Sequence, residues 1–294
     1  MTDPAPIPPP ATGTPHFVAP AGACDSHTHV FGPADRFRPS QPLVYPLPDA
    51  TPEAHARMRQ ANGIDRAVLV QPAPYAADPA AMLAAVAASG GTLKAVAVAL
   101  SPDAPLGQWA EAGVVGLRFT EARTPDGKRY PGSVGFDALI DLAPAMRSAG
   151  LHAQLWAPAA VLDEHLPQLL RLGLPIVIDH MGMPDRGEAG GGAAFRRLLS
   201  YVRDADLWVK LTLCRVGRPD LDEDDDLRQL HRRMIEARPE RMLWGSDWPY
   251  VRMTPAPDAA TMLDIFADWA GDPDLARRIL VDNPNRLFAF EETT

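Results

Sequence analysis

Cysteine and net positive charge are both scarce in this 294-residue sequence. The two cysteines, Cys24 and Cys214, are too few for a disulfide scaffold or a thiolate metal cluster, and we expect both to be small buried residues. The formal net charge of −9 argues against a nucleic-acid-binding protein, which needs a basic face. It does not exclude an anionic substrate, because the local field in a cleft can oppose the net charge.

Long apolar runs are also missing. No stretch approaches the length of a membrane span, and residues 1–20 contain seven prolines but no apolar core of a signal peptide. We therefore expect a cytoplasmic protein that does not act at a membrane. Residues 1–20 are predicted to form an extended, proline-rich arm, and residues 21–294 one domain. Monomer and homodimer both remain open.

What the sequence does contain is a regular alternation of short apolar runs and helical patterns. The runs, typical of parallel strands covered on both faces, are residues 23–31, 66–72, 94–100, 114–119, 151–157, 175–181, 207–213 and 241–248. Helical patterns occupy residues 51–62, 78–89, 136–150, 159–173, 193–204, 225–237 and 259–271, and a last helix over 273–290 is expected to seal one end. The alternation predicts a single-domain (β/α)8 barrel. A doubly wound open sheet is the alternative, although no glycine-rich phosphate loop follows the first strand.

Polar residues cluster at the ends of several predicted strands. In a (β/α)8 barrel, chemistry belongs at the C-terminal ends of the strands. The first strand offers His27 and His29, which share a face because side chains alternate along a strand. The sixth strand ends at His180 and the eighth at Asp247, whereas Asp179 is expected from alternation to point away from the barrel interior. These side chains suit either a zinc site or a set of hydrogen-bonding catalysts.

Four segments carry a resemblance to a known family. In chain order, "DSHTHVFG", "VIDHMGMPD", "VKLT" and "MLWGSDWPY" resemble motifs of the amidohydrolase superfamily. More narrowly, they are similar to its lactonase branch, which includes 2-pyrone-4,6-dicarboxylate lactonases, sugar-acid lactonases and a lactone isomerase. The resemblance extends from about residue 20 to residue 290. It implies a deformed TIM barrel and a hydrolase that opens a ring ester or a similar bond.

Two features of the binuclear members of that superfamily are missing. Those members bridge two metals with a lysine or glutamate at the end of the fourth strand and add a histidine on the fifth. Here Glu121 lies beyond the end of the fourth strand, and His152 lies at the start of the fifth, at the opposite end of the barrel. The lactonase branch includes enzymes that need no metal, and we expect no required cofactor. The alternative is a single divalent metal such as Zn²⁺, held by His27, His29, His180 and Asp247.

The expected reaction assigns a role to each of these side chains. Lactone hydrolysis needs a nucleophilic water, a polarised carbonyl and a proton for the leaving alkoxide. Asp247 is the predicted general base, and the three histidines are predicted to hydrogen-bond the oxygens on which charge develops. Arginines after the strands indicate a small anionic lactone, because a guanidinium matches a carboxylate. The predicted substrate-binding residues are Arg118, Arg123, Tyr45, Arg215 and Trp156, of which the resemblance favours Arg118 and Tyr45.

Other functions on the same scaffold remain open. They are a metal-dependent decarboxylase, an amide hydrolase, a lactone isomerase and a catalytically idle barrel that only binds a ligand. The complete set of three histidines and one aspartate argues against the idle barrel.

Overall fold

Eight parallel strands form the centre of the molecule. The computed structural model of the protein describes residues 7–290 except residues 9, 11, 41, 42, 44, 125, 219 and 220. Each strand pairs in parallel with the next one along the chain. The strands are β1 (Cys24–Thr28), β2 (Arg66–Val70), β3 (Leu93–Ala97), β4 (Val114–Thr120), β5 (His152–Trp156), β6 (Ile176–Ile178), β7 (Leu207–Leu211) and β8 (Met242–Trp244).

The sheet closes where the end of β8 meets β1. The backbone N–H of Asp247 donates to the carbonyl of His27, and that of His29 donates to the carbonyl of Trp248, each over 2.9 Å. The buried Asp25 carboxylate adds a side-chain link, because it accepts from the backbone N–H of Ser246 over 3.0 Å. The single-domain (β/α)8 prediction is therefore confirmed, and each of the eight apolar runs overlaps one strand.

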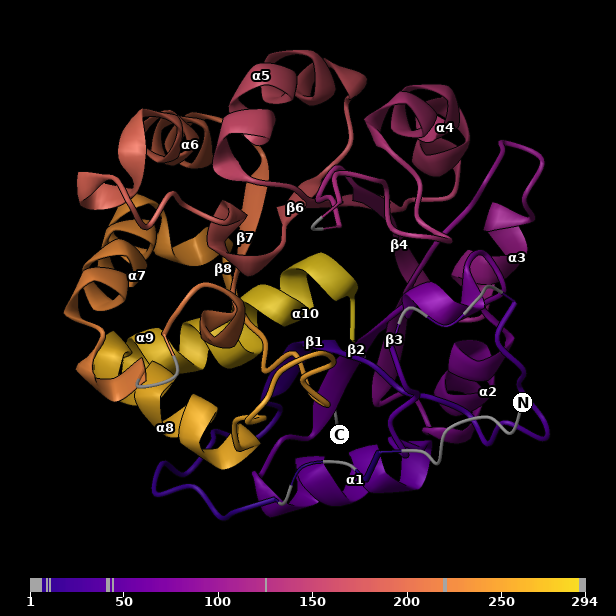
Figure 1. The fold of residues 1–294 in the computed structure, drawn as a ribbon, viewed down its shortest axis with the longest axis horizontal. Coiled ribbons are helices and arrows are strands. Elements are labelled where there is room, and N and C mark those ends of the chain that lie inside the picture. Colours follow the sequence, from indigo (N-terminus) through magenta and orange to yellow (C-terminus); the bar gives the residue numbers. More distant parts are fainter. Residues whose placement is uncertain are drawn as a thin grey trace.

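Helices surround this barrel in chain order (Figure 1). They are α1 (Pro52–Ala61), α2 (Ala80–Ala88), α3 (Leu106–Glu111), α4 (Phe136–Ser148), α5 (Ala159–Leu169), α6 (Gly192–Asp204), α7 (Asp225–Ala237) and α8 (Ala259–Ala270). The Thr51 side chain caps α1 by accepting from the N–H of Ala54. Helix α3 was not predicted, because it has six residues and buries only Leu106.

The final helical segment seals the floor of the barrel, which is the end opposite the C-terminal ends of the strands. It consists of α9 (Pro273–Arg277), one turn of π-helix (Arg278–Asp282) and α10 (Asn283–Phe288), which crosses the centre of the view in Figure 1. Phe288 packs in the apolar barrel interior with Trp208 and Leu243. The His152 ring lies 5.8 Å from the Phe288 ring, so this histidine lies at the floor, as predicted.

Residues 13–17 of the N-terminal arm lie against α8 and its N-terminal cap. The backbone N–H of Phe17 donates to Asp264 over 2.8 Å, and that of Gly13 donates to Asp258 over 3.0 Å. The division at residue 20 stays a prediction, and residues 1–6, 9 and 11 of the arm lie outside the described residues. Among the described residues, no helix combines the length and the apolar character that a membrane span requires.

Candidate active site

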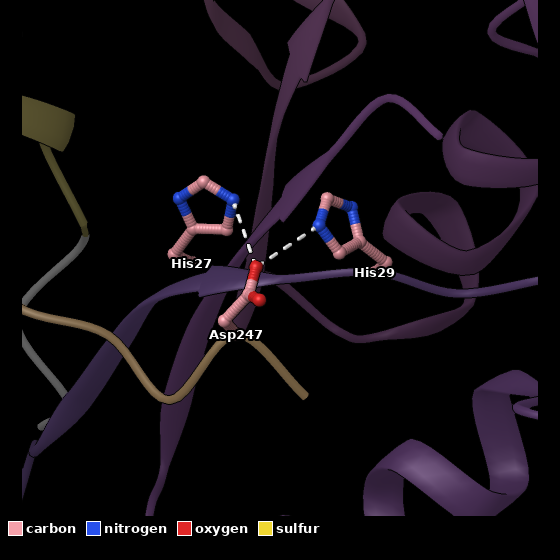
Figure 2. A group of neighbouring side chains, drawn as sticks. All are labelled: His27, His29 and Asp247. Carbon is pink, nitrogen blue, oxygen red and sulfur yellow. Dashed lines mark ion pairs between the residues drawn. The ribbon is translucent and has the colours of Figure 1, made fainter. Parts of the chain in front are cut away.

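His27, His29 and Asp247 meet at the mouth of the barrel, the end formed by the C-terminal ends of the strands. Figure 2 shows both histidines pointing a ring nitrogen at the same carboxylate oxygen. Asp247 Oδ1 lies 3.5 Å from His27 Nε2 and 3.4 Å from His29 Nε2. His27 and Asp247 are almost completely buried. The backbone hydrogen bonds that close the barrel also set this geometry, because they join the same residues.

The other ring nitrogen of each histidine also has a polar partner. His29 Nδ1 lies 2.8 Å from the carbonyl oxygen of Val70, which can only accept, so Nδ1 carries a proton. His27 Nδ1 lies 3.2 Å from Asp179 Oδ1 and 3.5 Å from Lys210 Nζ, so it has both an acceptor and a donor beside it. The Nε2 atoms of both rings face Asp247 Oδ1. Two imidazole nitrogens that converge on one carboxylate oxygen suit a shared proton, a water or a cation.

The same donor set fits a divalent metal. His27, His29 and Asp247 each offer a ligand atom within 4.8 Å of the others, and all three residues are buried. His27, Asp179 and His180 form a second such group that shares the His27 ring. Imidazole and carboxylate are the usual ligands of catalytic zinc, and Asp179 beside His27 is the kind of outer partner that orients such a ligand.

Asp179 points into the barrel, and the prediction that it faces away was wrong. Alternation along β6 runs from the interior residue Val177 to Asp179, and the backbone then turns at His180, where φ is 51°. The turn brings the His180 side chain inward as well, with its ring 4.8 Å from the His27 ring. Asp179 Oδ2 accepts from Arg118 Nε and from Gln154 Nε2, each over 3.1 Å. This carboxylate thus joins three strands beneath the histidines.

Lys210 and Gln154 complete the buried network, and sequence reasoning had given neither a role. Lys210 is fully buried, and its Nζ donates to Gln154 Oε1 over 2.7 Å. Its Nζ also lies 3.5 Å from His27 Nδ1 and 3.7 Å from Asp179 Oδ1. A signal was available, because Lys210 and the interior residue Trp208 lie two apart in β7 and therefore share a face.

Burial and charge set the protonation states. Burial lowers the pKa of His27 well below its usual value and that of His180 to about 4, although nearby carboxylates oppose both shifts. Burial would raise the pKa of Asp247, but the adjacent Arg215 guanidinium and a hydrogen bond with His29 lower it well below its usual range. Burial also lowers the pKa of Lys210 to about 8. Near neutral pH the site therefore combines neutral His27 and His180 rings with an ionised Asp247.

A cavity of about 310 Å³ opens above this network. Its lining includes His29, His180, Asp247 and four of the five predicted substrate-binding residues, Arg118, Tyr45, Arg215 and Trp156. His27 lies behind this lining. Arg123 is not among the lining residues; it pairs with Glu121 over 2.7 Å and is about half exposed. The structure therefore does not bring Arg123 to the cavity.

Arg252 also lines the cavity, and it was not predicted because it follows the last strand in an irregular loop. Its φ is 66°, and the neighbouring Asp247 has the same value. Residues other than glycine rarely adopt this left-handed backbone conformation, because it costs them about 1 kcal/mol or more. Such strained positions cluster at functional sites, and here both residues line the cavity.

The fold is a (β/α)8 barrel whose candidate catalytic groups come from β1 and from the ends of β1, β6 and β8. The chain belongs to the amidohydrolase family: the model described as Amidohydrolase matches residues 24–290. It is therefore a hydrolase of the amidohydrolase superfamily, as the sequence motifs predict.

Three similar proteins give a more specific comparison than the family does. The chain is 33% identical over 290 residues to the 2-pyrone-4,6-dicarboxylate hydrolase of Comamonas testosteroni, covering 95% of this chain and 93% of that one. It is 30% identical over 284 residues to the D-galactarolactone isomerase of Agrobacterium fabrum, covering 93% of each. A solved structure from Agrobacterium tumefaciens superimposes with a TM-score of 0.82 at 27% identity, covering 95% of this chain and 100% of that one. Both named relatives act on rings, one as a hydrolase and one as an isomerase.

Proposed function

We propose that this protein is a lactonase that hydrolyses a small anionic lactone with a water activated at Asp247. The observation that carries the proposal is the single carboxylate oxygen, Asp247 Oδ1, that faces both His27 and His29 beside the cavity. The similarity to a 2-pyrone-4,6-dicarboxylate hydrolase supports it, because a 2-pyrone is a cyclic ester.

The proposed reaction begins with a water that hydrogen-bonds Asp247 Oδ1. The water oxygen attacks the lactone carbonyl carbon while its proton moves to Asp247. The carbonyl oxygen becomes negative, and the neutral His180 ring, which lines the cavity, donates a hydrogen bond to it. The ring C–O bond then breaks, and the proton on Asp247 moves to the leaving alkoxide. The product is a hydroxy acid, and Asp247 returns to its ionised state.

Arg215 limits the basicity of Asp247. Its Nε donates to Asp247 Oδ2, which keeps Oδ1 directed toward the histidines but lowers the pKa of the carboxyl group. A weak base needs a water that is already polarised. His27 and His29 hydrogen-bond the water through Nε2 and orient it, and we propose that no metal is required. A divalent metal, the alternative for this donor set, would supply a water of lower pKa.

A lactone isomerase is the second candidate, because the D-galactarolactone isomerase covers almost the whole chain. Hydrolysis and isomerisation differ in their products. Hydrolysis consumes water and creates a carboxylic acid, which releases a proton near neutral pH. Isomerisation does neither, since the ring ester is retained in a new position.

The test is a panel of five- and six-membered lactones, assayed with and without a chelator in ¹⁸O-labelled water. We expect proton release and one ¹⁸O atom in the new carboxylate, with rates that survive chelation. Ring migration without label would favour the isomerase. Carbon dioxide release from a carboxylate substrate, in place of ring opening, would contradict both. Complete loss of activity on chelation, with recovery on adding Zn²⁺, would overturn the metal-free form of the proposal.

A further inference from the structure

Two of the three arginines that line the cavity are already engaged by carboxylates. Arg118 Nη2 lies 3.1 Å from Asp179 Oδ2, and Nε of the same guanidinium donates to that oxygen. Arg215 Nε donates to Asp247 Oδ2. Both carboxylates are buried, so releasing either arginine would leave a buried negative charge without its partner. Arg118 and Arg215 are therefore poorly placed to give up their partners for a substrate.

Arg252 differs from these two arginines. It lines the same cavity but has no carboxylate partner within ion-pair distance among the described residues. Its Nη1 donates to the hydroxyl of Tyr130 over 2.8 Å, and its guanidinium carbon lies 5.4 Å from the centroid of the Tyr130 ring. The side chain is exposed at the cavity rim, so an entering anion can reach the N–H groups that Tyr130 does not use.

Tyr130 is itself held by an aromatic neighbour. Its ring stacks on Trp156 with a centroid separation of 5.4 Å and an interplanar angle of 24°. Trp156 in turn lies under Arg118, whose guanidinium carbon is 4.9 Å from its ring centroid. This packing positions Tyr130 before any ligand arrives, and Tyr130 orients Arg252. Such preorganisation reduces the entropy lost when the arginine binds an anion.

We propose that Arg252, held by Tyr130, is the specificity-determining residue that recognises the anionic substituent of the substrate, and that the preferred substrate carries one such group. Among the described residues, Asp179 pairs with Arg118 and Asp247 pairs with Arg215, and both arginines line the cavity. Of the three lining arginines, Arg252 is the one whose charge is left for the ligand. A second anionic group would have to compete with a buried carboxylate. This inference rests on the proposed lactonase function, whose substrate class it narrows.

Turnover of a matched pair of substrates tests the role of Arg252. The pair is 5-oxotetrahydrofuran-2-carboxylate and its neutral carboxamide, which share the lactone ring. We expect wild-type kcat/KM to favour the carboxylate by roughly 10- to 100-fold, the scale of a charged hydrogen bond. Arg252→Gln should lower kcat/KM for the carboxylate much more than for the carboxamide and so remove this preference. Arg232→Gln, an exposed position on α7, is the control and should keep the preference. A preference that survives in Arg252→Gln would overturn the inference.

Direct binding separates this inference from the lactonase proposal. Tetrahydrofuran-2-carboxylate and tetrahydrofuran-2,5-dicarboxylate lack the lactone carbonyl, and calorimetry can measure their Kd whether or not any lactone is turned over. We expect Arg252→Gln to weaken binding of the monocarboxylate by roughly 10-fold or more, and the dicarboxylate to bind no more tightly than the monocarboxylate. Unchanged binding in the variant contradicts the role of Arg252, and much tighter binding of the dicarboxylate contradicts the single-anion preference. Absence of lactone turnover, with these binding results intact, contradicts only the proposed function.

Discussion

Buried histidines lie at both ends of the barrel, and their surroundings differ. At the floor, His152 packs against Phe288, and neither of its ring nitrogens has a hydrogen-bond partner among the described residues. At the mouth, His27 is just as buried but has the Asp179 and Asp247 carboxylates on its two ring nitrogens. Burial lowers the pKa of both imidazoles. A low pKa therefore does not mark the functional histidine; the convergence of carboxylates on both ring nitrogens does.

The largest expected effect comes from breaking that convergence with Asp247→Asn. The amide keeps the shape of the side chain but cannot accept the proton of the attacking water. We expect kcat to fall by roughly 10²- to 10⁴-fold, the usual scale for a general base, with KM little changed. Steady-state kinetics on the best lactone of the panel measures both. Unimpaired turnover would remove Asp247 from its proposed role.

A smaller effect is expected from Lys210→Met, which removes a group behind the histidines without touching the cavity lining. Lys210 holds Gln154 and flanks Asp179, and both help to position His27. Because Lys210 does not line the cavity, kcat should fall by roughly 10- to 100-fold while KM changes little. In ¹⁵N-histidine NMR spectra, the ring-nitrogen shifts of His27 should change.

The matched control for Lys210→Met is Lys94→Met. Lys94 lies at the floor, where its Nζ is 5.9 Å from the Phe290 ring centroid. We expect this variant to retain kcat, KM and the His27 signals. Equal losses in the two variants would indicate a general effect of removing a lysine from the barrel and not a positioning role for Lys210.

The same contrast between mouth and floor shows what the sequence could predict. The apolar runs and the alternation of His27 with His29 depend on local patterns, so all eight strands and the position of the histidine pair at the mouth followed from them. The inward orientation of both Asp179 and His180 did not, because alternation turns only one of two adjacent residues inward, and no local pattern indicates the left-handed turn at His180 that brings in the second. The role of Arg252 required knowledge of which carboxylates the neighbouring arginines already bind. Such partners lie far apart in the chain, and only the closed barrel brings them together.

A structural change at the floor should affect stability and leave the chemistry intact. Gly116 in β4 pairs with His152, and a Cβ at Gly116 would lie 2.4 Å from His152 Nε2. We expect Gly116→Ala to lower the free energy of unfolding by about 1–3 kcal/mol, the usual cost of overpacking. Urea unfolding at pH 7 measures the change. The kcat of the folded variant should match that of the wild type, and a large loss of kcat would show that the two ends of the barrel are coupled.

The smallest expected effect is on the acid sensitivity of the fold and comes from His152→Leu. Burial lowers the pKa of His152 from 6.5 to about 3, so the unfolded chain binds a proton that the folded chain excludes between these values. The contribution of this exclusion to stability is complete above pH 6.5 and is lost as the pH falls toward 3. Leucine does not titrate, so between pH 6 and pH 5 the variant should lose about 1 kcal/mol less unfolding free energy than the wild type. Urea unfolding at the two pH values measures the difference.

His55 and His231, which are also buried with pKa values lowered to about 3, should supply the acid sensitivity that remains. An unchanged pH dependence would mean that His152 is already protonated in the folded state. His152 would then share its burial, but not its protonation state, with the buried rings at the mouth.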